Sequence, residues 1–246
     1  MSLLFRLSII LIVISCASEK PKGKTEAEVL YKEAQNLMDD GRYILATEKL
    51  NQLKNQYPYS IYATPSELLM ADILYEQESY VESAAAYLLF RDFHPKHERL
   101  AYVVYKIAQS YYKQMPETYD RDLQPAFEAI KYYKELKMKF PNNKYSLKAN
   151  KKISKCQQMI RDKEQYIADF YFKTENYEAA LWRYKDILEN FKNKKLVSHS
   201  ARRIVLSNYH LKNWGDCYNA AQKFESIIKS NSDFKEALNK CKAKFK

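Results

Sequence analysis

Small residues recur along this chain at a constant interval. Ala34, Ala71 and Ala108 lie 37 positions apart each time, and Ala168 and Val205 are separated by the same interval. A second series consists of Ala46, Ser83, Ala129, Ala180 and Cys217, in which the same interval of 37 separates Ala46 from Ser83 and Ala180 from Cys217. Two antiparallel helices approach closely only where one side chain is small. The interval therefore predicts a stack of helical hairpins, each about 37 residues long.

The residues around these anchors fit the tetratricopeptide repeat (TPR) pattern of two helices per unit. An aromatic residue stands three positions before four of the second-helix anchors, namely Tyr43, Tyr80, Tyr177 and Trp214. Pro58, Pro95 and Pro141 close the first three units, because proline removes a backbone donor and biases its predecessor away from helical angles. Only three glycines occur in 246 residues, which argues against the many turns of a sheet protein.

The register breaks once, between Ala108 and Ala168, which lie 60 apart and so exceed the interval by 23. Nine of the extra residues fall inside the third hairpin, within residues 114–125. The other 14 come close to four helical turns, so they lengthen a helix from about Lys144 to Lys173 without rotating its apolar face. We expect an all-α solenoid of about five TPR-like hairpins, with this long helix between three N-terminal and two C-terminal repeats.

The N-terminal segment reads as a lipoprotein signal. An apolar run from Leu7 to Ile14 is too short to span a bilayer as a helix but fits the hydrophobic part of a secretory signal. It ends in "VISC", which is similar to a bacterial lipobox. We expect residues 1–15 to be removed, Cys16 to be lipidated, and residues 16–26 to form a flexible tether. The alternative is an ordinary signal peptide cut near Ala17.

Charge and cysteine content argue against nucleic-acid binding and against a zinc site. The net charge of +11 comes from basic residues that are scattered among acidic ones, so we expect a solvated surface and no nucleic-acid groove. Cys156, Cys217 and Cys241 form no CxxC motif, so a zinc site is not expected. We expect all three to be small buried fillers; the alternative is that Cys217 and Cys241 pair in an oxidising compartment.

No catalytic constellation is visible. The four histidines form no HExxH motif, and "HPKH" at positions 94–97 is expected to be a solvated turn. Three glycines are too few for a glycine-rich phosphate-binding loop. We expect neither enzymatic activity nor a metal or cofactor.

Stacked hairpins of this kind bind extended peptides on the surface lined by their first helices. The positions three before, one after and four after each first-helix anchor face that groove. Lysines beside the tyrosines of the third repeat are suited to a peptide carboxylate. The expected groove residues are Tyr31, Gln35, Leu68, Asp72, Tyr75, Tyr105, Lys106, Gln109, Tyr112 and Lys113. The alternative is that these tyrosines merely cap a water-filled groove, since 22 tyrosines must be placed somewhere in the fold.

Together, the lipobox, the charged tether, the five TPR-like units, "YPYSIY" and "YDRDLQPAFEAIKYYKEL" resemble the BamD family, the TPR lipoproteins of the outer-membrane β-barrel assembly machinery. The resemblance covers the mature chain and implies an outer-membrane lipoprotein facing the periplasm. It implies that residues 27–142 read the C-terminal signal of unfolded outer-membrane proteins. Residues 143–246 are then expected to dock on the POTRA domains of BamA, alongside other assembly-machinery lipoproteins.

Arg183 stands where that family carries an arginine facing BamA, and its planar fork suits a carboxylate partner. The alternative is a solvated helix arginine. Two departures are visible, since Lys192 replaces the usual proline and the fifth repeat is degenerate. The competing function is that of a different TPR lipoprotein, such as a secretion or pilus pilotin or a cell-envelope coordinator.

Overall fold

The computed structural model describes residues 22–228 and 232–245, and within these residues it contains eleven α-helices and no strand. This confirms the predicted all-α solenoid of TPR-type helices. The helices are α1 Glu26–Asp39, α2 Tyr43–Gln56, α3 Ala63–Glu76, α4 Tyr80–Phe93, α5 Leu100–Lys113, α6 Gln124–Lys139, α7 Lys144–Lys173, α8 Tyr177–Asn190, α9 Lys194–His210, α10 Trp214–Ile228 and α11 Ser232–Phe245.

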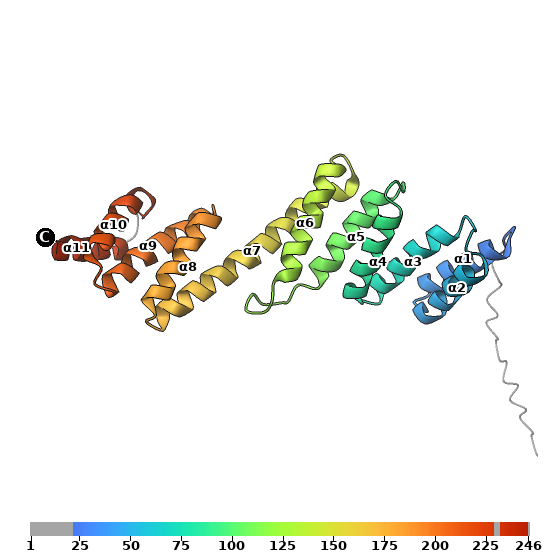
Figure 1. Cartoon of the computed structure of the whole chain (residues 1–246), viewed down its shortest axis with the longest axis horizontal. Helices are drawn as coiled ribbons and strands as arrows, with labels where there is room; N and C mark the ends of the chain where they lie inside the picture. Colours follow the sequence, from blue (N-terminus) through green and yellow to red (C-terminus); the bar gives the residue numbers. More distant parts are fainter. Residues whose placement is uncertain (1–21, 229–231, 246) are drawn as a thin grey trace, which may run out of the picture. The chain divides into compact units, whose positions relative to one another are not determined.

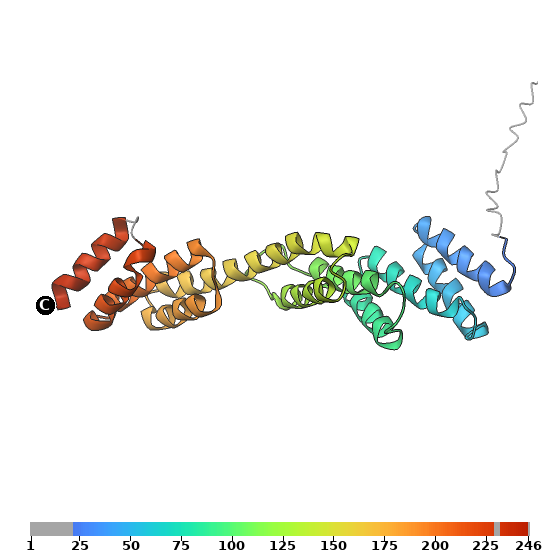
Figure 2. The same cartoon turned by 90° about the horizontal axis from the view of Figure 1, so that it is seen from above.

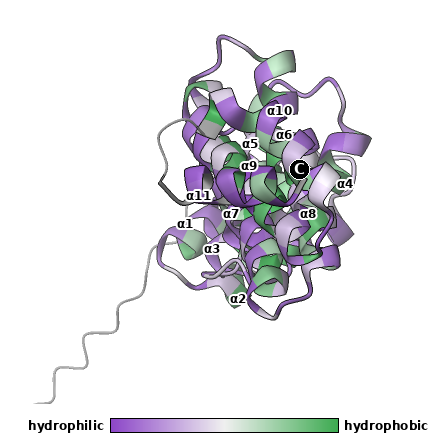
Figure 3. Cartoon of the chain, turned by 90° about the vertical axis from the view of Figure 1, so that its left-hand side faces the viewer, coloured by the Kyte–Doolittle hydropathy of each residue, from purple (hydrophilic) through white to green (hydrophobic). Residues whose placement is uncertain are grey.

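The repeat anchors account for this regularity. All ten predicted small-residue anchors are fully buried, including Ser83 and Cys217. Helices α1, α3, α5, α7 and α9 each end five residues after their anchor. The four predicted aromatics are the first residues of α2, α4, α8 and α10. Figure 3 shows hydrophobic and hydrophilic segments alternating along single helices, as expected of helices that bury one face.

The helix ends also follow the predicted signals. Tyr57, His94 and Phe140 each precede a proline, and each caps the C-terminus of its helix with φ between −134° and −123° and ψ between 54° and 57°. Phe191 precedes Lys192 instead and is extended, with ψ of 141°. Only residues 191–193 separate α8 from α9.

The insertion lies where the register break predicts it. The connection from α5 to α6 runs over residues 114–123, whereas the other first helices are joined to their second helices by three residues. The long helix α7 has the predicted limits, Lys144–Lys173. It packs against α5 and α6 with its first half and against α8 and α9 further along (Figures 1 and 2).

The chain forms two compact units, Met1–Glu78 and Ser79–Lys246. In the second unit α7 contacts helices on both sides of position 142, so residues 79–246 form a single unit. The boundary between the compact units therefore lies at Glu78. The expected division at position 142 separates a peptide-binding half from a partner-docking half, and it stays a prediction.

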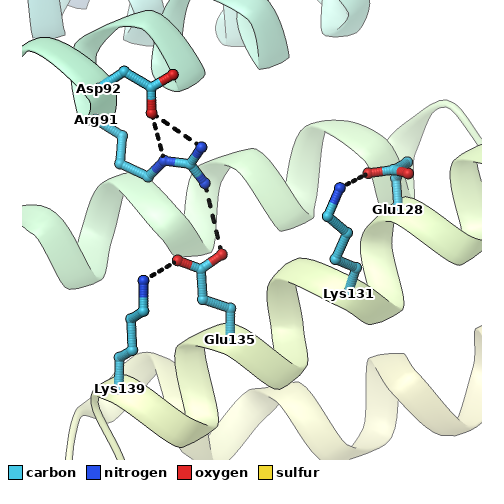
Figure 4. Close-up of polar contacts among 6 residues, drawn as sticks. All are labelled: Arg91, Asp92, Glu128, Lys131, Glu135 and Lys139. Atoms are coloured by element: carbon cyan, nitrogen blue, oxygen red, sulfur yellow. Dashed lines mark hydrogen bonds and ion pairs between the residues drawn. The ribbon is translucent and has the colours of Figure 1, made fainter.

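In the second unit, α4 and α6 are joined by an ion-pair network. Nη1 of Arg91 on α4 lies 3.6 Å from Oε2 of Glu135 on α6, and Glu135 also accepts a hydrogen bond from Lys139 at 2.8 Å (Figure 4). The Arg91 guanidinium lies 5.5 Å from the centre of the Tyr132 ring, which stacks in turn on Tyr111 of α5. These contacts hold α4, α5 and α6 together.

One expectation about the cysteines was wrong. Cys217 of α10 and Cys241 of α11 are joined by a disulfide, with their Cα atoms 5.8 Å apart, whereas we expected two unpaired fillers. Both are fully buried, as expected. The pairing arises because α11 folds back against α9 and α10, a packing that the degenerate fifth repeat did not reveal. Cys156 is free and buried, as predicted.

Candidate functional site

The residues expected to bind a peptide fall into two sets, one in each compact unit. The set in the second unit is centred on α5. Tyr105 stacks on Tyr145 of α7, with ring centres 4.8 Å apart and planes inclined by 22°. The Tyr105 hydroxyl accepts a hydrogen bond of 2.8 Å from Nε2 of Gln109. The structure thus brings Tyr105 and Gln109 together, one helical turn apart, and adds an aromatic ring from α7.

A lysine from α7 completes this surface. Nζ of Lys152 lies 4.0 Å from the centre of the Tyr112 ring, in cation–π contact. Burial lowers the pKa of Lys152, and the nearby Lys113 lowers it further. Lys152 therefore offers a partly desolvated ammonium beside Tyr112. We call Tyr105, Tyr112, Tyr145 and Lys152 the α5–α7 surface.

Sequence reasoning missed the two residues that α7 contributes. Tyr145 and Lys152 are seven positions apart, which places them on one face of a helix, two turns from each other. That spacing was a usable signal, but only contact with α5 shows what the face meets.

The other predicted groove residues on α5 are Gln109, Lys106 and Lys113, and they do not form part of the α5–α7 surface. Gln109 is only 7% exposed, so its side chain positions Tyr105 and offers a peptide little contact area. Nζ of Lys106 is 5.8 Å from the Tyr102 ring centre, and Nζ of Lys113 is 5.5 Å from that of Tyr80. Both lysines thus lie against aromatic rings other than the predicted ones.

The predicted residues of the first unit form a separate set. Tyr31 packs on Tyr62, with ring centres 5.5 Å apart, and both lie against Leu30 and Leu53. Tyr57 packs against the same cluster, so Tyr57 and Tyr62 are structural residues. Gln35 is exposed and Tyr75 is half-buried.

Two positions in α3 do not offer the surface we expected. Leu68 is 1% exposed and Asp72 is 7% exposed, so both side chains are buried. The repeat pattern places these positions on the groove side of the helix, but neighbouring side chains cover them.

Arg183 lies on α8, partly exposed. Its Nη1 is 3.9 Å from Oε2 of Glu164 on α7, and its guanidinium lies 5.1 Å from the ring centre of Trp182. Trp182 is 63% exposed. A weakly paired arginine beside an exposed indole is a combination that protein interfaces favour, although the role expected for Arg183 stays a prediction.

A polar cluster that sequence reasoning missed joins α7, α8 and α9. Asp169 of α7 accepts a 2.5 Å hydrogen bond from the Tyr184 hydroxyl and lies 2.7 Å from Nε2 of His199. Burial raises the pKa of the Tyr184 hydroxyl, and its hydrogen bond to Asp169 raises it further. The hydroxyl therefore stays a proton donor, and the cluster serves as a structural joint between three helices.

The remaining predictions concern the N-terminal signal, the histidines, metal binding and the membrane. Cys16 and the signal segment lie outside the described residues. His94 and His97 lie in the turn after α4, as expected, and their rings pack on Phe90. Within residues 22–228 and 232–245, no group of three His, Cys, Asp or Glu side chains is arranged to hold a metal. No helix in that part of the chain is long and apolar enough to cross a membrane.

Comparison with known proteins finds relatives over most of the chain. Two relatives are each named outer membrane protein assembly factor BamD. The protein from Rickettsia prowazekii is 28% identical over 90% of this chain and 87% of its own length. The protein from Neisseria gonorrhoeae is 28% identical over 83% of both chains. Among solved structures, the TPR2AB domain of yeast Sti1 in its pHSP90 complex is 11% identical, with a TM-score of 0.45, over 90% of this chain and 84% of its own.

A sequence model of a protein family covers most of the chain. The family is YfiO, described as outer membrane lipoprotein, and the match extends over residues 23–223. These residues span every helix from α1 to α9 and most of α10. The chain therefore belongs to the YfiO family of outer membrane lipoproteins.

Proposed function

We propose that this protein is a lipid-anchored assembly factor for outer-membrane β-barrel proteins, acting without catalysis as a scaffold and a receptor for unfolded substrates. The observation that carries the assembly role is the family match over residues 23–223, together with relatives named as assembly factors. The repeats supply the physical means, because stacked helical hairpins present extended surfaces to peptides and partner domains.

The anchor in this proposal is a lipid on Cys16, with the folded chain on the periplasmic side of the outer membrane. The Cys217–Cys241 disulfide supports an oxidising compartment such as the periplasm, because structural disulfides are rare in the cytosol. Labelling with a palmitate analogue tests the anchor. The wild-type chain is expected to take up label and Cys16→Ser is not, whereas equal labelling of both would exclude Cys16.

The receptor surface in this proposal is the α5–α7 surface, and the ligand is a peptide that ends in an aromatic residue with a free carboxylate. Tyr105 and Tyr145 supply large apolar contact at low entropic cost. Lys152 supplies an ammonium whose attraction to a carboxylate is strengthened by partial burial. Substrate proteins that expose such a C-terminus while unfolded then bind before they insert.

Peptide titration distinguishes carboxylate recognition by the α5–α7 surface from non-specific binding. A peptide with a free aromatic C-terminus is expected to bind about tenfold more tightly than its amidated form, the scale of one charge-assisted hydrogen bond. Lys152→Gln removes that preference, while Lys185→Gln, an exposed lysine on α8, keeps it. Equal affinity of the wild-type chain for both peptides would contradict a carboxylate site.

The docking surface in this proposal is the part of α8 around Arg183, and its partner is a POTRA domain of BamA. Pull-down of the native protein tests it and also separates the competing function. Recovery of BamA supports the assembly role, and recovery of a secretin supports a pilotin. Arg183→Glu is expected to reduce BamA recovery, with Lys185→Glu as the control of equal charge change on the same helix.

A further inference from the structure

The positive charge of this protein is concentrated in one hairpin. The whole chain has a net charge of +11, with 41 basic and 30 acidic residues. Residues 131–155 alone contain nine lysines and a single acidic residue, Glu135, for a net charge of +8. These residues form the second half of α6, its connection to α7 and the first half of α7. The expectation of evenly scattered basic residues is therefore wrong for this hairpin.

Four of these lysines form one stripe along α7. Lys144, Lys148, Lys151 and Lys155 follow a spacing of four, three and four residues, which keeps them on one face of a helix. All four are exposed, and none makes an ion pair with any residue of the described chain. The opposite face of this half of α7 is buried and consists of Ser146, Ala149, Ile153 and Cys156. We call the four lysines the α7 lysine stripe.

The stripe opposes the stability of its own helix. Lysines near a helix N-terminus meet the positive end of the helix dipole, and the first turn of α7 contains no acidic residue. Lysine pairs four residues apart, such as Lys144 with Lys148 and Lys151 with Lys155, repel each other. The rest of α7, residues 156–173, carries three basic and three acidic residues. Helix formation therefore does not explain the stripe, which points to an anionic partner.

Exposed apolar side chains accompany the stripe. Leu147, between Lys144 and Lys148, is 78% exposed, and Met138 near the end of α6 is 75% exposed. Lysines interleaved with exposed aliphatic side chains are the pattern by which helices bind a bilayer surface, where the charges meet headgroups and the apolar groups enter the interface. A protein partner with an acidic surface would account for the lysines. It would not account for the exposed Leu147 and Met138.

We propose that the α7 lysine stripe binds the anionic phospholipid headgroups of a bilayer surface. This goes beyond the proposed function and takes from it only the presence of a membrane, through the anchor at Cys16. A basic patch commonly acts beside a lipid anchor as a second membrane-binding signal. The stripe then holds the second compact unit against the surface to which the N-terminus is tethered.

The test uses the chain from Ala17 onward without lipid, which contains every described residue. Co-sedimentation compares vesicles of pure phosphatidylcholine with vesicles of equal parts phosphatidylcholine and phosphatidylglycerol. The stripe variant carries Lys144→Gln, Lys148→Gln, Lys151→Gln and Lys155→Gln. The matched control carries Lys185→Gln, Lys192→Gln, Lys194→Gln and Lys195→Gln, four exposed lysines of α8, α9 and their connection. Thermal unfolding of both variants checks folding, and the stripe variant is expected to unfold no earlier than wild type.

The wild-type chain is expected to sediment with the anionic vesicles and not with the neutral ones. The stripe variant is expected to bind on the order of several hundredfold more weakly, since each of its four lysines contributes about fivefold near an anionic surface. The control variant is expected to lose less than about tenfold, from long-range charge alone.

Three results would overturn the proposal: no preference of the wild-type chain for anionic vesicles, equal losses in the two variants, or unchanged binding of the stripe variant. None of these outcomes involves Cys16 or BamA, so the proposed function is tested separately.

Discussion

The hydroxyl of Tyr184 donates a hydrogen bond of 2.5 Å to Oδ1 of Asp169, and the same oxygen lies 2.7 Å from Nε2 of His199. Nε of Arg203 lies 3.9 Å from it as well. One carboxylate oxygen on α7 thereby joins α8 and α9. Ala168 and Ala180 are fully buried in the same core cluster as Tyr184, so the polar joint borders the packed core of these helices.

Asp169→Asn is expected to destabilise the second compact unit by about 1–3 kcal/mol at neutral pH, because hydrogen bonds to a charged acceptor are lost in a half-buried site. Urea denaturation measures this change. Glu117→Gln, in the exposed connection between α5 and α6, is the control and is expected to be neutral. A neutral Asp169→Asn variant would show that the cluster does not stabilise the joint.

The same carboxylate predicts a pH dependence. Burial raises the pKa of Asp169, but hydrogen bonds from His199 and Tyr184 outweigh burial and leave this pKa below its usual value. The stabilisation is therefore complete above the unfolded-state pKa of about 3.9 and is lost as the pH falls through the lower folded-state pKa. Below about pH 4, the free energy of unfolding is expected to fall more steeply for wild type than for Asp169→Asn. Parallel curves for the two proteins would contradict this.

The connections inside four hairpins predict opposite effects of two substitutions. Gly41, Glu78, Glu175 and Lys212 occupy the middle of a three-residue connection and have φ between 59° and 73°. Gly41→Ala is expected to cost about 1 kcal/mol from backbone strain alone, because no atom lies within 4 Å of the added Cβ. Glu78→Gly relieves the same strain and is expected to stabilise by up to about 1 kcal/mol. Thermal unfolding of the two variants is expected to shift in opposite directions, and a shift in one direction for both would contradict the explanation.

The disulfide between Cys217 and Cys241 predicts a redox-dependent stability. The bond closes a loop with a sequence separation of 24, for which loop-closure entropy gives about 3 kcal/mol. Cys241→Ser is expected to lower the free energy of unfolding by about that amount, and reductant is expected to destabilise wild type but not the variant. An equal response of both to reductant would rule out the bond as its cause.

Cys156 is expected to resist alkylation in the folded protein. Burial raises the pKa of its thiol to about 11, and its Sγ lies 3.3 Å from Sδ of Met115. In the chain from Ala17 onward it is the one cysteine outside the disulfide. Iodoacetamide at mildly alkaline pH is expected to modify it only after denaturant is added. Rapid modification of the native protein would show that this thiol is accessible.

The lysine stripe predicts a stability gain that does not depend on any ligand. Lys144 is the first residue of α7, where a negative charge suits the helix dipole. Lys144→Glu is expected to stabilise α7 by about 0.3–1 kcal/mol at low salt, and added salt is expected to reduce this gain. Lys155→Glu is the control, since it lies three turns further along and gains nothing from the dipole. Equal gains in both variants would attribute the effect to relief of lysine repulsion only.

The sequence alone determined the helical repeats of this protein. The positions of Ala34, Ala71 and Ala108 revealed the period, and the limits of α7 followed from the length of the register break. These features are local or periodic, because close helix packing requires a small residue at a constant place in each hairpin. Proline and its predecessor end a helix through their own backbone geometry.

Contacts between side chains on different helices were decided only by the tertiary structure. Lys152 meets Tyr112 across 40 positions, Asp169 meets His199 across 30, and Cys217 meets Cys241 across 24. Periodicity states which face of each helix is buried, but the partner of a given side chain depends on the axial offset and rotation between two packed helices. Those two quantities result from the fit of all side chains in the interface at once, so no short stretch of sequence contains them.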